Sequence, residues 1–248
     1  MTYNFLVLSV LCCIPGLVFF IIRKDLRPVI VFMALVSIPF GFTESLFYPE
    51  YWEPVFLWDL ADKIGFGLED ILFVAGLGAL TSTIYAVVFR KNFSSVVFTN
   101  HKSSLFYAGI VLCVTGVLVF AAVLLHIPMI YGSVVIMLLM SAALLAFRRD
   151  LILPSLAGGV LTCAVYTFIC IIFSVLFKDV FFLVWHGEKF SNIFIAGVLL
   201  EEYLYSFAAG VAGTMFYPFV TGRRFIVQSL QERHDGRTWR EPDLPYRV

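Results

Sequence analysis

The sequence predicts an all-α, polytopic membrane protein with seven transmembrane helices. Of its 248 residues, 61% are hydrophobic and only 14% are charged, whereas soluble domains carry about 25% charged residues. The apolar residues are also gathered in runs of about 20, which is the length that an α-helix needs to cross the hydrocarbon of a bilayer. The composition and the length of the runs therefore indicate the same fold class.

Seven apolar runs reach this length, and each predicts one helix. The division between the fourth and fifth runs depends on His126 and Pro128 in a very short turn. No basic segment precedes the first run and no small-residue cleavage site follows it, so we expect a retained helix rather than a signal peptide. The predicted helices cover residues 3–22, 27–47, 68–89, 104–125, 128–147, 152–177 and 192–220.

The basic residues predict the orientation. Only Lys63, Lys178 and Lys189, of 17 lysines and arginines, lie in segments on the side of the N-terminus. Because cytoplasmic loops are enriched in Lys and Arg, we expect the N-terminus outside and the C-terminus inside. We also expect the two outer loops to lie along the membrane surface, because aromatic rings favour the headgroup level. These rings are Tyr48, Tyr51, Trp52, Trp58, Phe181, Phe182 and Trp185.

Similar segments in the two halves predict an internal repeat. RKDLRP at 23–28 resembles RRDLILP at 148–154, and LED at 68–70 resembles LEE at 200–202. Helices 1–3 then correspond to helices 5–7 in a parallel arrangement, and a functional site is expected between the halves. The predicted division is a membrane domain at 1–222 and a cytoplasmic polar tail at 223–248. Within the domain, the repeats cover 1–92 and 128–222, and the connecting helix covers 104–125.

Two acidic pairs, Glu69–Asp70 and Glu201–Glu202, interrupt this apolar chain. A charged side chain at mid-bilayer costs roughly 2.5–3.5 kcal/mol on insertion scales, so acids inside the membrane are candidates for function. A protonated carboxyl group beside an ionised one provides a proton donor and a proton acceptor. Adjacent helical residues point about 100° apart, so only one member of each pair can face a shared cleft. We favour Glu202 as the donor.

The alternative interpretation is that the acids cap helices, because carboxylates are stabilised near a helix N-terminus. For Glu69 and Asp70 this alternative stays open, since both follow closely on two glycines. Glu201 and Glu202 come ten residues after Ser191. We interpret that position as too deep in a helix for simple capping.

Glu44 is a further candidate for acid–base chemistry, near the outer end of the second helix and without a counterpart in the other half. It could equally be an interfacial acid beside Tyr48. Aromatic faces stabilise cations, and a small-residue face from Ser206 to Gly213 suits close helix contact or substrate passage. The candidate substrate-binding residues are Phe47, Trp58, Phe73, Trp185, Tyr203, Tyr205 and Ser206.

We expect no metal, no cofactor and no nucleic-acid partner. The five cysteines lie in apolar stretches, without CxxC or Cys/His ligand spacing. No dinucleotide fingerprint, P-loop, GxSxG or HExxH motif occurs. The EExxxR pattern of prenyl-endopeptidase-type proteases is also missing, because Tyr-Leu-Tyr-Ser follows the second glutamate pair. Self-association into a homo-oligomer is left open.

Two segments, WDLADKIGFGLEDILF at 58–73 and LLEEYLYSF at 199–207, resemble the acidic elements of the integral-membrane lycopene cyclases, in the type built from two repeats. The resemblance covers residues 1–225. Gly67 and Leu199 stand near positions where that family usually has proline, and Asp70 replaces a glutamate.

The resemblance implies a proton-initiated ring closure of lycopene-type ends in the cell membrane, without net redox change. The substrate would be a hydrophobic carotenoid or isoprenoid, and the acid–base set would be Glu69, Asp70, Glu201 and Glu202. The related membrane terpene cyclases of meroterpenoid pathways use the same acid-triggered logic, so another isoprenoid substrate stays open. The non-enzyme alternative is a carotenoid- or lipid-binding protein or a proton-linked transporter.

Overall fold

Long helices occupy most of the chain, close to the predicted positions. The structure is a computed structural model that describes residues 3–95 and 101–227. Its long helices are α1 (Asn4–Ile22), α2 (Arg27–Ser37), α4 (Leu68–Val88), α5 (His101–Leu124), α6 (Met129–Phe147), α7 (Ile152–Leu176) and α9 (Leu200–Thr221). The protein is therefore mainly helical, as predicted.

Short elements join these helices at both ends of the bundle. The 3₁₀-helices are η1 (Lys24–Leu26), η2 (Ile38–Leu46), η3 (Leu57–Asp59), η4 (Arg149–Leu151) and η5 (Gly187–Lys189), and the short α-helices are α3 (Leu60–Ile64) and α8 (Val180–Leu183). The strands β1 (Lys91–Phe93) and β4 (Phe225–Val227) pair antiparallel, and β2 (Phe194–Ile195) pairs with β3 (Val198–Leu199). The first residues of the predicted tail thus pair with the segment that follows α4, while residues 228–248 of that tail lie outside the described residues.

Five helical segments of the described chain are long and apolar enough to cross a membrane. They are Asn4–Ile22, Lys24–Leu46, Leu68–Val88, Met129–Phe147 and Arg149–Leu176. A shorter apolar segment, Gly109–Leu124, belongs to α5, and α9 is not among the five. The seven-span topology and the orientation of the termini stay predictions.

The last predicted helix, 192–220, is wrong in its first part. Residues 194–199 form the β2–β3 hairpin, and α9 begins only at Leu200. Ala196 and Gly197 at the hairpin turn both have positive φ, 50° and 79°, as two-residue hairpin turns of type I′ require. Because these turn residues are apolar or small, the hydropathy of residues 192–220 does not distinguish the hairpin from the helix that follows it. Glu201 and Glu202 consequently lie in the first turn of α9, and the interpretation that they lie too deep for a helix start is wrong.

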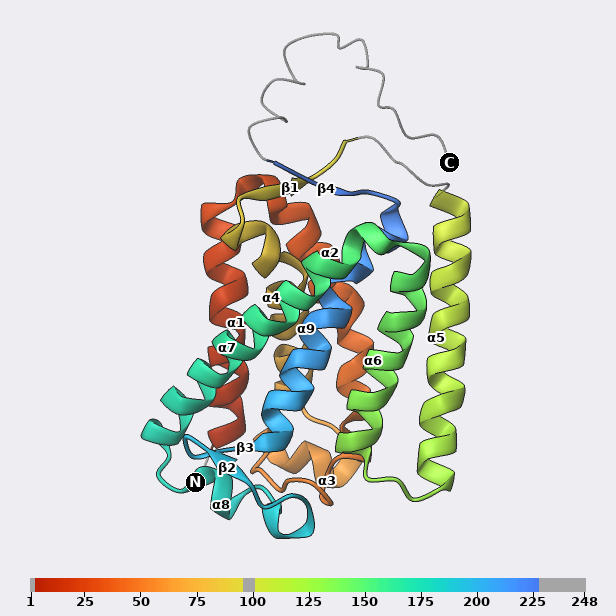
Figure 1. The fold of residues 1–248 in the computed structure, drawn as a ribbon. Coiled ribbons are helices and arrows are strands. Elements are labelled where there is room, and N and C mark those ends of the chain that lie inside the picture. The colour runs from red at the N-terminus through yellow and green to blue at the C-terminus, as the bar shows by residue number, and fades with distance from the viewer. Residues whose placement is uncertain (1–2, 96–100, 228–248) are drawn as a thin grey trace, which may run out of the picture.

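The central pair of helices is α4 and α9, one from each half (Figure 1). α1 and α2 pack against α4, whereas α6 and α7 pack against α9. α5 lies at the edge of the bundle beside α6 (Figure 1). A Cβ atom at Gly213 would collide with the side chain of Thr81, so glycine allows α4 and α9 to approach this closely. The small-residue face of α9 therefore serves as a helix contact at this position.

A buried arginine joins the turn between α6 and α7 to the end of α9. The Arg148 guanidinium donates to both carboxylate oxygens of Asp150, at 2.8 Å each. It also donates to the carbonyl oxygens of Pro218 at 3.3 Å and Arg223 at 2.7 Å. Planar, bidentate pairing of this kind is specific to arginine.

The other half contains the same arrangement. Arg23 donates to the two carboxylate oxygens of Asp25, at 2.9 and 2.7 Å, and to the carbonyl oxygens of Ala86 and Lys91. Arg23 and Arg148 are the arginines of the two similar segments, RKDLRP and RRDLILP. The residues that they reach lie at matching places at the ends of α4 and α9. The sequence similarity therefore corresponds to one structural device present in each half.

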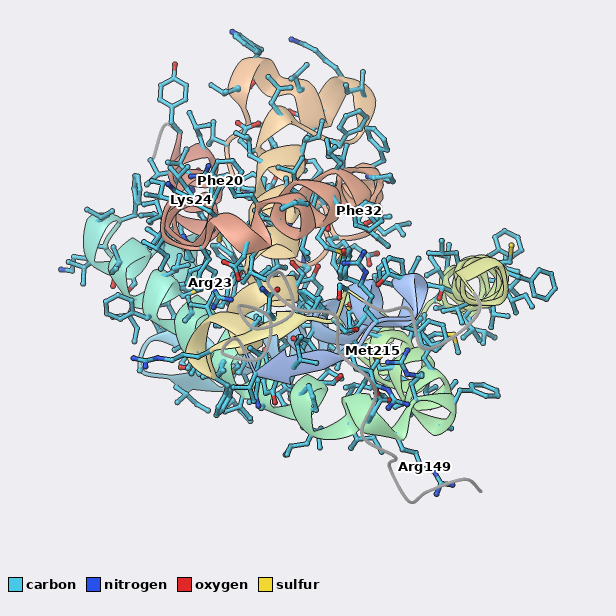
Figure 2. The ribbon with its side chains drawn as sticks, turned by 90° about the horizontal axis from the view of Figure 1, so that it is seen from above. Phe20, Arg23, Lys24, Phe32, Arg149 and Met215 are labelled. Atoms are coloured by element: carbon cyan, nitrogen blue, oxygen red, sulfur yellow. The ribbon has the colours of Figure 1, made fainter. Side chains whose placement is uncertain are left out.

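We expect Arg148→Met to destabilise the fold, because it keeps the length of the side chain but removes every donor. Hydrogen bonds to charged groups are worth about 1.5–3 kcal/mol each, so the unfolding midpoint in detergent should fall clearly. Arg149→Met is the matched control, because Arg149 is exposed and points away from the helices (Figure 2). Equal midpoints for the two variants would contradict this account of Arg148.

Candidate functional site

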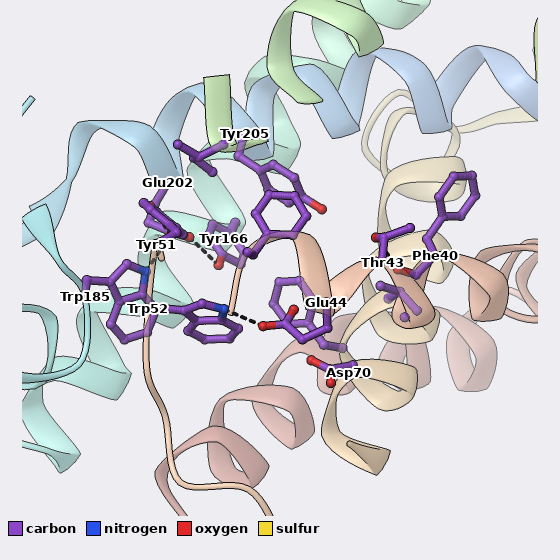
Figure 3. A pocket seen from close by; sticks show the side chains of 15 residues that line it. Phe40, Thr43, Glu44, Tyr51, Trp52, Asp70, Tyr166, Trp185, Glu202 and Tyr205 are labelled. Atoms are coloured by element: carbon purple, nitrogen blue, oxygen red, sulfur yellow. Dashed lines mark hydrogen bonds between the residues drawn. The ribbon is translucent and has the colours of Figure 1, made fainter. Parts of the chain in front are cut away.

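A small cavity between the two halves collects three carboxyl groups. Its volume is about 60 Å³. Glu44 reaches it from η2, Asp70 from the first turn of α4, and Glu202 from the first turn of α9 (Figure 3). The other lining residues are Phe40, Gly41, Thr43, Phe47, Tyr51, Trp52, Phe73, Val74, Ile130, Tyr166, Trp185 and Tyr205. Most of these side chains are aromatic.

Glu202 is surrounded by hydrogen-bond donors. Its Oε1 accepts from the Tyr51 hydroxyl at 2.7 Å and from Trp185 Nε1 at 2.9 Å, and its Oε2 accepts from the Tyr166 hydroxyl at 2.7 Å. Burial raises the pKa of the Tyr51 hydroxyl, and the neighbouring Glu202 carboxylate raises it further. Tyr51 therefore keeps its proton and acts as a donor.

Glu44 and Asp70 form a pair of neighbouring carboxyl groups. Glu44 Oε1 accepts from Trp52 Nε1 at 2.5 Å, and the Glu44 carboxyl group lies beside that of Asp70 in the cavity wall (Figure 3). Asp70 Oδ2 also accepts the backbone N–H of Gly67 at 2.6 Å, so this acid caps α4 as well as facing the cavity. Asp70 therefore both caps α4 and lines the cavity.

Gly41 brings η2 close enough to α4 for this pairing. A Cβ atom at this position would lie 3.2 Å from the Asp70 carbonyl carbon and 3.2 Å from the Ile71 nitrogen. Such contacts are with backbone, which cannot move aside without shifting the start of α4. The absence of a side chain at Gly41 therefore helps to place Glu44 beside Asp70.

The two loops that are predicted to lie outside (the outer loops) meet at the cavity, where each contributes a lining tryptophan. Trp52 and Trp185 form an antiparallel bridge, in which Glu53 N donates to Val184 O at 2.8 Å and His186 N donates to Tyr51 O at 2.9 Å. The two indole rings lie 5.0 Å apart. One indole donates to Glu44 and the other to Glu202. The bridge therefore positions one carboxyl group from each half.

This arrangement differs from the expected loops along the membrane surface. Tyr51 and Trp52 are only 5% and 8% exposed, and Phe181 and Trp185 are also buried. The loops fold inward because their aromatic side chains cover the buried carboxyl groups and pack on one another. Trp58 and Phe182 are exceptions, at 68% and 60% exposed, and both lie outside the cavity lining.

Glu69 and Glu201, the first members of the two acidic pairs, hold the outer loops. Glu69 Oε1 accepts the backbone N–H of Leu57 at 2.6 Å. Glu201 Oε1 accepts from the Tyr131 hydroxyl at 2.6 Å and from the Ser191 N–H at 3.0 Å. Neither glutamate lines the cavity. The structure therefore separates the four acids into two that face the cavity and two that bind loops.

The remaining candidates also fall into two groups. Phe47, Phe73, Trp185 and Tyr205 line the cavity, together with the acids. Tyr203 and Ser206 do not: the Tyr203 hydroxyl donates to Ile195 O at 2.8 Å, and the Ser206 hydroxyl donates to Tyr203 O at 3.1 Å. Both therefore hold local structure around the start of α9.

Tyr51, Trp52 and Tyr166 belong to the site but were not among the predicted site residues. Trp52 could have been found from the repeat, because it lies in the first outer loop as Trp185 lies in the second. Tyr166 has no such signal, since it lies within the apolar run of α7. Within the described ranges, no group of three His, Cys, Asp or Glu side chains is placed to hold a metal ion.

We expect Glu201→Ala to loosen the second outer loop, because the Ser191 N–H and the Tyr131 hydroxyl lose their acceptor. The loss is about 1.5–3 kcal/mol for each hydrogen bond to a charged group. Hydrogen exchange of residues 187–199 in detergent should become faster, while Glu50→Ala, an exposed glutamate of the other loop, should leave it unchanged. Unaltered exchange in Glu201→Ala would contradict the loop-binding role.

The comparisons with known proteins give one family match. Residues 128–220, which contain α6, α7 and α9, match the lycopene cyclase family. No curated protein and no solved structure matches the chain significantly. The apolar helices and the family match together indicate a membrane protein and support a carotenoid cyclase function in general terms. Residues 128–220 are therefore similar to the lycopene cyclase family, and the resemblance predicted from the acidic motifs is confirmed for this part of the chain.

Proposed function

We propose that this protein closes the linear ends of a lycopene-type carotenoid into rings, by proton transfer and without net redox change. The observation that carries the proposal is the convergence of Glu44, Asp70 and Glu202 on one cavity between the halves. Cyclisation of this kind requires one group that donates a proton to an alkene and another that removes a proton from the resulting cation. Buried carboxyl groups in different surroundings can divide these two tasks.

The aromatic lining suits a cationic intermediate. Aromatic faces attract a cation by roughly 0.5–2 kcal/mol each, and Phe47, Phe73 and Tyr205 surround the cavity together with two indoles. The same rings exclude water, which would otherwise capture the cation. An aromatic lining and the exclusion of water are both properties that a carbocation reaction requires of an active site.

The substrate end needs more room than the described cavity offers, since about 60 Å³ corresponds to roughly two water molecules. η2 forms one wall, and its nine residues make an unusually long 3₁₀-helix, a feature that often marks a hinge. Phe40 in this wall is 49% exposed on the outside of the bundle. We propose that η2 moves to admit the substrate from the side, out of the hydrophobic layer of the membrane.

The cavity lies at the end of the bundle opposite Arg23 and Arg148. Helix α1 begins at the cavity end, near the β2–β3 hairpin (Figure 1). With the orientation that the basic residues predict, the ring-forming site would face the outer half of the membrane. Two alternatives stay open. A carotenoid-binding protein would retain the carotenoid without chemical change, and a proton-linked transporter would move its substrate without chemical change.

Coexpression in a bacterium that accumulates lycopene tests the proposal. We expect monocyclic or bicyclic carotenes from the wild-type protein, and a rate that is lower by a factor of about 10²–10⁴ in Glu202→Gln, since that is the usual contribution of acid–base catalysis. Glu188→Gln is the control, because its side chain is 65% exposed outside the cavity. Pigment extracts separated by chromatography give the product ratio, and the membrane content of each variant gives its folding. Unchanged lycopene with well-expressed wild-type protein would contradict the proposal.

A further inference from the structure

We propose that the Glu44–Asp70 pair supplies the proton and that Glu202 is the base that removes one. This assignment rests on the proposed cyclase function and deepens it. It also reverses the hypothesis drawn from the sequence, which favoured Glu202 as the donor. The argument depends on the hydrogen-bond partners of the three carboxyl groups.

The partners of Glu202 match an ionised carboxylate. An ionised carboxylate only accepts hydrogen bonds, and an indole N–H only donates them. Glu202 accepts from the indole of Trp185 and from two tyrosine hydroxyls, so donors reach both of its oxygens. Three donors aimed at one buried carboxyl group stabilise its negative charge. A base must be unprotonated before the reaction, and Glu202 has the surroundings of such a group.

The partners of Glu44 and Asp70 match a shared proton. Repulsion between two neighbouring carboxylates in a buried site raises the free energy of the doubly ionised pair, so at rest the two groups hold at least one proton between them. Trp52 Nε1 and Gly67 N each donate to one member, which fixes the pair without supplying a counter-charge. The pair therefore keeps one acidic proton in the cavity wall. Its position across the cavity from Glu202 separates the donor from the acceptor (Figure 3).

The reaction balances with these two groups alone. The pair protonates the terminal alkene, forming one C–H bond and a tertiary cation. The π electrons of the next alkene form the ring C–C bond and move the positive charge to another tertiary carbon. Glu202 then accepts a proton from a neighbouring carbon, and the electrons of that C–H bond form the ring double bond. The product is an isomer of the substrate, and one proton must return from Glu202 to the pair before the next turnover.

Deuterium labelling separates the two roles. Membranes containing each variant are incubated with lycopene in D₂O, and the recovered carotenoids are analysed by mass spectrometry. The double variant Glu44→Gln/Asp70→Asn keeps the shape of the pair but has no acidic proton. Glu202→Gln keeps the donor and loses the base. Glu188→Gln, outside the site, serves as the control for expression and handling.

We expect the wild type and Glu188→Gln to form rings that carry one deuterium for each ring closed. Glu202→Gln should form few rings of the normal kind, yet it should still put deuterium into recovered lycopene, or into products formed when the cation is captured by water or loses a different proton. The double variant should incorporate at least 100-fold less deuterium than the wild type.

Deuterium in the products of the double variant, or none in any product of Glu202→Gln, would overturn the assignment. If the wild type itself forms no ring, the proposed function fails and the assignment fails with it. If the wild type forms rings but deuterium enters in the wrong variant, only the assignment fails. Deuterium incorporation is measured per molecule of folded protein in the membrane. A low value that is caused by poor expression is thereby distinguished from a low value that is caused by loss of the proton donor.

Discussion

The burial of three carboxyl groups at the junction of two repeats is the constraint on which the rest of the structure depends. Glu44, Asp70 and Glu202 are almost entirely removed from solvent, and unpaired charges in such surroundings cost several kcal/mol. Each carboxyl group therefore needs donors close at hand. The outer loops fold inward to supply them, and the bridge between Trp52 and Trp185 is the point at which the two loops are joined.

The halves share a framework but differ in the chemistry that it carries. Arg23 and Arg148 hold the C-terminal ends of α4 and α9 by the same set of hydrogen bonds. Near the N-terminal ends of these helices, one indole of the bridge donates to Glu44 and the other to Glu202. Glu202 also accepts from two tyrosine hydroxyls, that of Tyr166 in its own half and that of Tyr51 in the other, whereas Glu44 lies beside a second carboxyl group from its own half, that of Asp70. A similar framework thus surrounds two unlike acid sites, as a reaction with separate donor and acceptor requires.

Position within each acidic pair separates structural from chemical tasks. The first members, Glu69 and Glu201, accept hydrogen bonds from loop backbone, and the second members face the cavity. The turn of about 100° between adjacent helical residues makes this division unavoidable. A helix start suits both tasks, because its free N–H groups and its dipole stabilise negative charge.

The sequence by itself determined the helical class, the position of most long helices and the acids worth attention, because hydropathy and charge within a short window reflect the solvent in which each segment lies. It also indicated Phe47, Phe73 and Tyr205 as neighbours of those acids. The true start of α9, the burial of Tyr51 and Trp52, and the part played by Tyr166 were decided only by tertiary structure. The places of Tyr51 and Tyr166 depend on contacts between residues more than 30 positions apart, those with Glu202, and no local pattern reports them. The start of α9 follows from the β2–β3 hairpin, which the apolar residues of that segment conceal in the sequence. Tertiary structure also decides that Glu44 and Asp70 form a pair while Glu202 stands alone, since these acids come together only where η2, α4 and α9 meet.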